Sequence, residues 1–112
     1  MPLTREAIEL RDNFLYSNVE LILCDGTWTE PTNQEILSSA VLLVGPSTQQ
    51  TMVWQDGEHK LYFEFTMPNQ VVQANRLVLM SDSRYIAYII LPFKQIYRPG
   101  VVITIDGRTF SS

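Results

Sequence analysis

The sequence has 112 residues, of which 46% are hydrophobic and 18% are charged, and its formal net charge is −4. This length is typical of one domain, which we expect to span residues 1–112. The composition excludes a disordered tail, a collagen-like fibre and a disulfide-framed miniprotein. The negative charge argues against binding to nucleic acid or to an anionic membrane surface.

Cys24 is the only cysteine, so the chain cannot form an internal disulfide. Small secreted proteins usually depend on such bonds, and we therefore expect this chain to fold in the cytoplasm. The longest apolar stretches, residues 40–44 and 86–91, are far shorter than the roughly 20 residues of a membrane-spanning helix. No basic start followed by an apolar run indicates a signal peptide.

The first predicted element is a short amphipathic helix over about residues 4–15. Thr4 can cap its N-terminus through the side-chain hydroxyl, and Glu6 lies in the first turn, where negative charge is favourable. Apolar residues recur among charged ones at three- and four-residue spacings: Ala7, Ile8, Leu10, Phe14 and Leu15. A helix of three turns is marginal in water by itself, so we expect it to pack against another surface.

From Ser17 onward the apolar pattern changes to a period of two, which is typical of strands. The predicted strands are residues 19–24, 36–44, 51–55, 60–67, 76–80, 84–91 and 101–105. Phe63 and Phe65 fall on one face of their strand, which we expect to be buried. The turn residues Ser81-Asp82-Ser83 indicate a hairpin whose second strand Pro92 ends. We therefore predict a mainly β fold, an antiparallel β-sandwich or small barrel with one short N-terminal helix.

The sequence offers little catalytic or metal-binding chemistry. His59 is the only histidine and lies among charged residues in a predicted turn, so we interpret it as solvent-exposed. One histidine and one cysteine cannot supply the three or four ligands of a typical zinc site. We expect Cys24 to be packed or partly exposed rather than reactive. We therefore predict no catalytic residue, no cofactor and no metal, and keep a small hydrolase built around His59 as an alternative.

Two tryptophans leave a second alternative open. Trp28 and Trp54 lie in or near predicted loops, and exposed aromatic rings can stack against sugars. A glycan-binding β-sandwich module that uses Trp28 or Trp54 is therefore a possible function. Because the net charge is negative, the chain has no electrostatic groove for a phosphate backbone, and nucleic acid is not an expected partner.

The strand predicted at residues 84–91 carries apolar or aromatic side chains on both faces. One face would hold Tyr85, Ala87, Ile89 and Leu91, and the other Ile86, Tyr88 and Ile90. A strand of a monomeric sandwich normally exposes one polar face, so this strand is either central between layers or part of an interface. The N-terminal helix offers a second apolar surface, and together they favour a self-associating protein. The predicted contact residues are Tyr85, Tyr88, Ile90 and Phe93, with Arg84 and Arg98 nearby.

Charge is uneven along the chain. Residues 1–59 hold nine acidic and two basic side chains, whereas residues 60–112 hold three acidic and six basic ones. The two halves either neutralise each other within one domain or form opposite patches that meet between neighbouring copies.

The order of elements in the second half is similar to that of a known class of proteins. A strand ends at Phe65-Thr66-Met67-Pro68, a hairpin runs from Arg76 through Asp82 to Leu91-Pro92, and Tyr97-Arg98-Pro99-Gly100 leads into a β-branched run. This order resembles the C-terminal half of small β-sandwich virion structural proteins of tailed bacteriophages, of the tail, fibre-attachment or capsid-decorating type. The resemblance implies a non-enzymatic virion subunit, folded in the host cytoplasm, that contacts copies of itself and other virion proteins.

Overall fold

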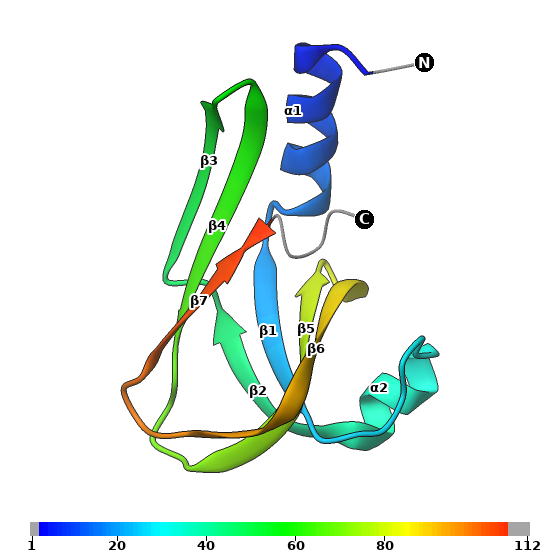
Figure 1. Cartoon of the computed structure of the whole chain (residues 1–112), viewed down its shortest axis with the longest axis vertical. Coiled ribbons are helices and arrows are strands. Elements are labelled where there is room, and N and C mark those ends of the chain that lie inside the picture. The colour runs from blue at the N-terminus through cyan, green and yellow to red at the C-terminus, as the bar shows by residue number, and fades with distance from the viewer. Residues whose placement is uncertain (1–2, 108–112) are drawn as a thin grey trace.

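The structure is a computed structural model that describes residues 3–107 of the chain (Figure 1). In chain order its elements are α1 (Arg5–Leu15), β1 (Val19–Cys24), α2 (Asn33–Ser39), β2 (Ala40–Pro46), β3 (Gln49–Gln55), β4 (Glu58–Thr66), β5 (Val72–Ser81), β6 (Arg84–Tyr97) and β7 (Val102–Asp106). The described part of the chain is therefore mainly β, as the sequence predicts.

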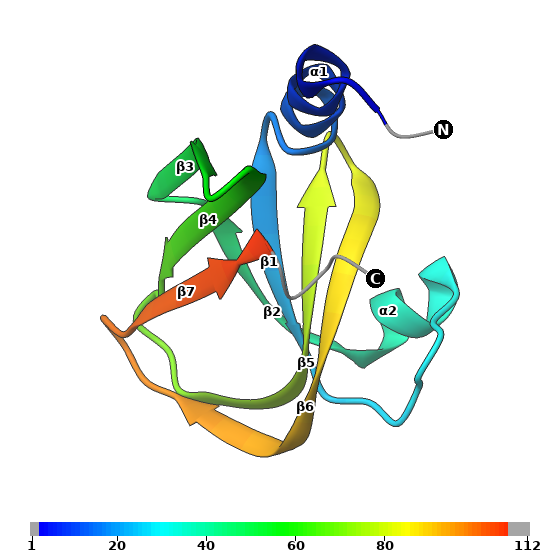
Figure 2. The ribbon, with the colours of Figure 1, turned by 45° about the horizontal axis from the view of Figure 1, so that its top comes forward.

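The strands form two open sheets that face each other in a sandwich-like arrangement (Figure 1, Figure 2). The four-stranded sheet has the order β2-β1-β5-β6, and the three-stranded sheet has the order β3-β4-β7. Every strand pairing is antiparallel. The predicted antiparallel sandwich with a short N-terminal helix is confirmed.

The main core lies between the two sheets. Phe63 and Phe65 of β4 are completely buried, on the face that the period-two pattern predicts. They pack with buried side chains from both sheets and their connections: Val19, Leu21, Leu23, Leu61, Met67, Ala74, Leu77, Leu79, Tyr97, Ile103 and Ile105. Removal of this apolar surface from water is the principal force that holds the two sheets together.

Helix α1 begins where the sequence predicts. The Thr4 hydroxyl accepts a hydrogen bond of 3.1 Å from the Ala7 backbone N–H, and Glu6 lies in the first turn. The helix lies at one end of the molecule, next to the hairpin of β3 and β4 (Figure 1). The predicted N-terminal helix is thus confirmed.

The prediction of a strand over residues 36–44 is wrong in its first part. Residues Asn33–Ser39 form α2, and β2 begins only at Ala40. The cause is a capping box before the helix. The Thr32 hydroxyl accepts from the Glu35 backbone N–H at 3.2 Å, and the Glu35 carboxylate accepts from the Thr32 N–H at 3.1 Å. These bonds satisfy backbone donors that a helix start otherwise leaves free.

Helix α2 and the loop before it cover part of the outer face of the four-stranded sheet. Ile36 of α2 and Trp28 of the loop pack with buried strand residues in a second apolar cluster that also contains Ile22, Cys24 and Val78. The central strands β1 and β5 are therefore covered on both faces.

Strand β6 is longer than predicted. It continues through Pro92, where we expect it to end, and reaches Tyr97. Its pairing with β5 shifts register between Ala74 and Arg76, so that β6 forms a bulge around Pro92. Proline is tolerated at this position because β6 is an edge strand, where not every N–H group has to pair with a neighbouring strand.

Polar side chains tie this bulged region to the loop after β1. The Asn75 side chain accepts from the Gly26 N–H at 2.9 Å and donates to the Gly26 carbonyl at 2.8 Å. Lys94 forms an ion pair with Asp25 at 3.0 Å. This pair joins the acidic first half of the sequence to the basic second half, so part of the charge is neutralised within the chain.

Candidate functional site

The six residues predicted to form an interface lie on or just after β6: Arg84, Tyr85, Tyr88, Ile90, Phe93 and Arg98. Tyr88, Ile90 and Phe93 expose 38%, 42% and 72% of their surface, and the neighbouring Ile96 exposes 49%. We call these four side chains the β6 surface. Tyr85 is only half-buried, and both arginines are exposed.

The two faces of β6 differ in what covers them. On the inner side, Ala87 and Ile89 pack against the main core. On the outer side, the Tyr88 ring makes an edge contact with the Trp28 ring, with 5.6 Å between centroids. Because β6 is an edge strand rather than a central one, its outer side is only partly covered.

The predicted assignment of Tyr85 to the same face as Ala87 is wrong, and so is that of Ile86 to the face of Tyr88, because Ile86 packs against the main core. The pairing of β5 with β6 shifts register between Leu79 and Met80. After this shift, Tyr85 packs with Met80 against the outer cluster, whereas Ala87 packs against the main core. The bulge brings Tyr85 to the same side of the sheet as Tyr88, which a strict period of two does not predict.

A groove of about 480 Å³ runs along this part of β6. The lining residues come from β6, from α2 and the loop before it, and from the end of α1: Tyr16, Pro31, Asn33, Ile36, Tyr85, Ile86, Ala87 and Tyr88. Sequence analysis finds the β6 tyrosines but not the α2 residues, because it predicts a strand where α2 forms. The lining combines three tyrosine rings with one side-chain amide, and it can accept a flat apolar group.

Helix α1 presents its apolar side to solvent. Leu10 and Phe14 expose 65% and 70% of their surface, and Leu3, just before the helix, exposes 53%. Ala7 lies between them on the same side of the helix. We call these four side chains the helix surface. The only buried side chain of α1 is Asp12, so the helix packs on the sheets through polar rather than apolar residues.

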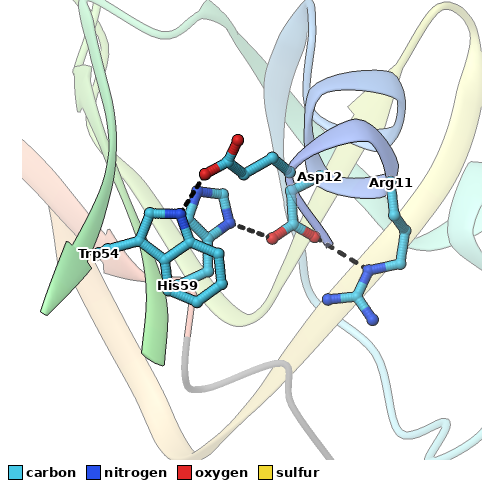
Figure 3. A network of polar contacts seen from close by, with 5 residues as sticks. Arg11, Asp12, Trp54 and His59 are labelled. Atoms are coloured by element: carbon cyan, nitrogen blue, oxygen red, sulfur yellow. Dashed lines mark hydrogen bonds and ion pairs between the residues drawn. The ribbon is translucent and has the colours of Figure 1, made fainter. Parts of the chain in front are cut away.

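A network of polar contacts holds α1 against the β3–β4 hairpin (Figure 3). His59 Nδ1 of β4 lies 2.6 Å from Asp12 Oδ2, and Arg11 Nε donates to Asp12 Oδ1 at 3.1 Å. Trp54 of β3 donates from Nε1 to a carboxylate oxygen of Glu9. The Trp54 and His59 rings are in contact, with 4.9 Å between their centroids.

Two more contacts extend this attachment along the helix. The Arg5 guanidinium lies 4.2 Å from the centroid of the Trp54 ring, a cation–π geometry. At the other end, the Tyr16 ring packs at 5.5 Å from that of Phe63 in the main core, and the Gln50 side chain donates to the Tyr16 carbonyl. The helix is therefore held along its whole length.

The prediction that His59 is a solvent-exposed turn residue is wrong. Its side chain is only 6% exposed, because His59 lies on the same face of β4 as Leu61 and Phe63 and beneath α1. The imidazole is used to bind Asp12.

Cys24 lies in the separate outer cluster, where burial raises the pKa of its thiol and a hydrogen bond to Ser39 lowers this pKa to a smaller extent. A buried thiol with a raised pKa is a poor nucleophile.

Trp28 lies in a loop, as the sequence predicts, but it is not the exposed ring that the glycan-binding alternative requires. Trp28 is 8% exposed, its Nε1 donates to the Ser39 hydroxyl at 2.9 Å, and the Arg76 guanidinium lies 5.2 Å from its ring centroid. Trp54 lies on β3 and contacts Arg5 and His59. Both tryptophans therefore serve the packing of the fold.

Within residues 3–107, no group of three or more His, Cys, Asp and Glu side chains is placed to hold a metal ion. Neither helix of this described range has the length and apolar character needed to cross a bilayer.

Comparison with known proteins gives no match. No protein-family model matches the sequence, and no similar protein is found among curated proteins or among solved structures.

Proposed function

We propose that the chain is a non-enzymatic structural subunit of a tailed-phage virion, of the tail, fibre-attachment or capsid-decorating type. It folds in the host cytoplasm and acts in the virion through contacts with copies of itself and with other virion proteins. The assignment to a virion rests on the resemblance of the order of elements between Tyr62 and Phe110. The proposed action through protein contacts rests on the β6 surface and the helix surface.

The observation that carries this proposal is the exposure of apolar side chains on two separate elements. The β6 surface and the helix surface together leave large rings and aliphatic groups in water, with Phe14 and Phe93 each more than two-thirds exposed. Exposed apolar side chains in such number favour a protein contact site, and aromatic residues are enriched at the centre of interfaces.

Charge supports the same function. Arg84 and Arg98 flank the β6 surface, are exposed, and make no ion pair with any residue of the described range 3–107. Charges at the rim of an apolar patch select a partner and orient it more than they add affinity. An acidic patch on a neighbouring subunit is the complement that these two arginines favour.

Two measurements test the proposal. Sedimentation equilibrium of the purified chain over a wide concentration range should show self-association, and mass spectrometry of purified phage particles that encode the chain should find it in a fixed ratio to the other virion proteins. Ile90→Ser with Phe93→Ser should weaken incorporation into particles, whereas Val71→Ser, at another exposed apolar site, should not. A chain that is monomeric at every concentration and absent from the particles would contradict the proposal.

The tyrosine-lined groove along β6 supports a second candidate, a glycan-binding module. Tyr85 and Tyr88 with Asn33 offer aromatic faces and an amide, a combination suited to sugar rings. Because Trp28 contacts Tyr88, its fluorescence should report a host oligosaccharide that enters the groove. Tyr85→Ala should abolish the change, and the absence of any change with the unmodified chain would exclude this function.

A further inference from the structure

The helix surface has the spacing of a helix–helix seam. Its three helical side chains, Ala7, Leu10 and Phe14, follow one another at intervals of three and four residues, and Leu3, which lies before the N-cap Thr4, precedes Ala7 by four. This is the apolar repeat by which two helices interlock side by side. The three large members are each at least 53% exposed, so nothing within the described chain covers the seam.

The opposite side of α1 is already occupied. Asp12 and Glu9 bind His59 and Trp54 of the β3–β4 hairpin. Figure 2 shows both sheets on one side of α1, and no other element of residues 3–107 lies on the opposite side of the helix. A second helix can therefore lie along the seam without displacing any contact that holds α1.

Two opposite charges flank the seam. Glu6 directly precedes Ala7, and Arg11 directly follows Leu10, so they border the apolar row on its two sides. In a parallel, in-register pair of identical helices, a charged residue that directly precedes an apolar position of the seam lies opposite the residue five places further along the second helix. Glu6 would then face Arg11 of the second copy, and the two-fold symmetry would form this pair twice. An antiparallel pair would instead place Glu6 near Asn13 and Arg11 near Thr4.

We propose that two copies of the chain associate through α1 in a parallel pair, with the helix surfaces in contact and each Glu6 opposite Arg11 of the second copy. The pairing rests on the self-association in the proposed function and names the surface responsible for it. Arg11 remains able to take part, because its side chain is 53% exposed and uses only Nε for Asp12, which leaves the other guanidinium N–H groups free to donate.

Sedimentation equilibrium with seam variants tests the contact. Leu10→Ser combined with Phe14→Ser should raise the dissociation constant of the dimer at least tenfold. The matched control is Leu37→Ser on α2, which changes an apolar helical residue that is 63% exposed. This variant should leave the dissociation constant of the dimer unchanged. Circular dichroism and thermal unfolding should show that all these variants stay folded, since the altered side chains are exposed.

Charge exchange tests the orientation. Glu6→Arg alone and Arg11→Glu alone should each weaken the dimer, because every cross-seam pair then has like charges. A mixture of these two variants should recover wild-type affinity, because both pairs in the mixed dimer have opposite charges. A mixture no tighter than the separate variants would overturn the parallel pairing.

The outcomes separate this proposal from the proposed function. A dimer that is insensitive to the seam variants but is weakened by Ile90→Ser and Phe93→Ser would overturn the role of α1 and leave self-association intact. A chain that stays monomeric at the highest concentration reached would overturn the α1 pair, and the particle analysis would then decide whether a virion role remains. Loss of the dimer in the seam variants with recovery in the charge-exchange mixture is the result that we expect.

Discussion

His59 and Asp12 lie 2.6 Å apart beneath α1, and each of the two side chains is almost fully buried. The contact joins residues 47 positions apart and sets how α1 is rotated about its own axis. With Asp12 turned toward the sheets, Leu10 and Phe14 face away from them. Together with the contacts of Arg5 and Glu9 with Trp54, this polar contact determines which side of the helix is available to other molecules.

Asp12→Ala should loosen α1. The change leaves His59 buried without its partner, and an unsatisfied buried polar group costs about 1–3 kcal/mol. We expect the free energy of unfolding in urea to fall by about that amount and the amide hydrogens of α1 to exchange faster. Asn13→Ala, at the exposed neighbouring position, is the control and should change stability by less than about 0.5 kcal/mol. Unchanged exchange in α1 would contradict this account of its attachment.

Phe63→Ala should lower the free energy of unfolding strongly, whereas Phe93→Ala should leave it nearly unchanged. Phe63 is completely buried between the sheets, whereas Phe93 is 72% exposed. Removal of a buried phenyl ring leaves a cavity and typically costs about 3–5 kcal/mol, whereas the Phe93 change should cost less than about 0.5 kcal/mol. Chemical denaturation measures both. If Phe93→Ala destabilises the monomer as much as Phe63→Ala does, Phe93 is not available for a partner.

Substitutions at the second residue of the Asp56-Gly57 and Asp82-Ser83 turns should change the stability of the protein in opposite directions. Gly57 follows Asp56 with φ 78°, and Ser83 follows Asp82 with φ 66°, a left-handed conformation that glycine adopts without strain. Ser83→Gly should stabilise the protein by about 0.5 kcal/mol, and Gly57→Ala should destabilise it by about 1 kcal/mol. A Cβ at Gly57 would meet no atom within 4 Å, so its effect comes from the backbone alone. Thermal unfolding measures both, and equal signs would contradict the explanation.

Stability should decline in alkaline solution. Burial raises the pKa of the Cys24 thiol above its usual 9.0 and the pKa of the Tyr16 and Tyr97 hydroxyls above 10.0. At a pH between the unfolded and folded values, the unfolded chain releases a proton that the folded chain retains, so stability falls as pH rises. The stabilisation is complete below about pH 9 and should be lost progressively above it.

Unfolding temperatures measured from about pH 7 to about pH 11 test this dependence. Tyr97→Phe removes one of the three groups, so the decline above about pH 10 should be shallower in this variant than in the unmodified chain. An unfolding temperature that stays constant or rises over this range would show that these groups titrate normally in the folded protein.

Local patterns predict most of the fold. The Thr4 cap locates α1, and the alternation that includes Phe63 and Phe65 predicts β4 and its buried face. Helix α2 also has a local signal, the capping box of Thr32 and Glu35, but the apolar run that follows it favours a strand. Short apolar runs can form either a helix or a strand, and here the capping box favours the helix.

The candidate site is less predictable because it depends on contacts distant in sequence. The burial of Asp12 requires His59 to lie opposite it. The apolar side of α1 alone predicts instead that Leu10 and Phe14 face the sheets and that Asp12 faces solvent. The alternation of His59 with Leu61 and Phe63 does indicate an inward-facing imidazole, so that part of the network has a sequence signal. The place of Tyr85 beside Tyr88 follows from a register shift, which no composition or spacing in β6 reveals.

Pro92 and the bulge around it divide the free edge of β6 into two short stretches. An uninterrupted edge can recruit strand after strand and grow into a fibril, whereas a missing N–H group and a break in register stop such growth. Strand β6 is therefore protected against recruiting strands of further molecules through its backbone. We accordingly expect concentrated solutions of the chain to form no fibrils that grow from this edge.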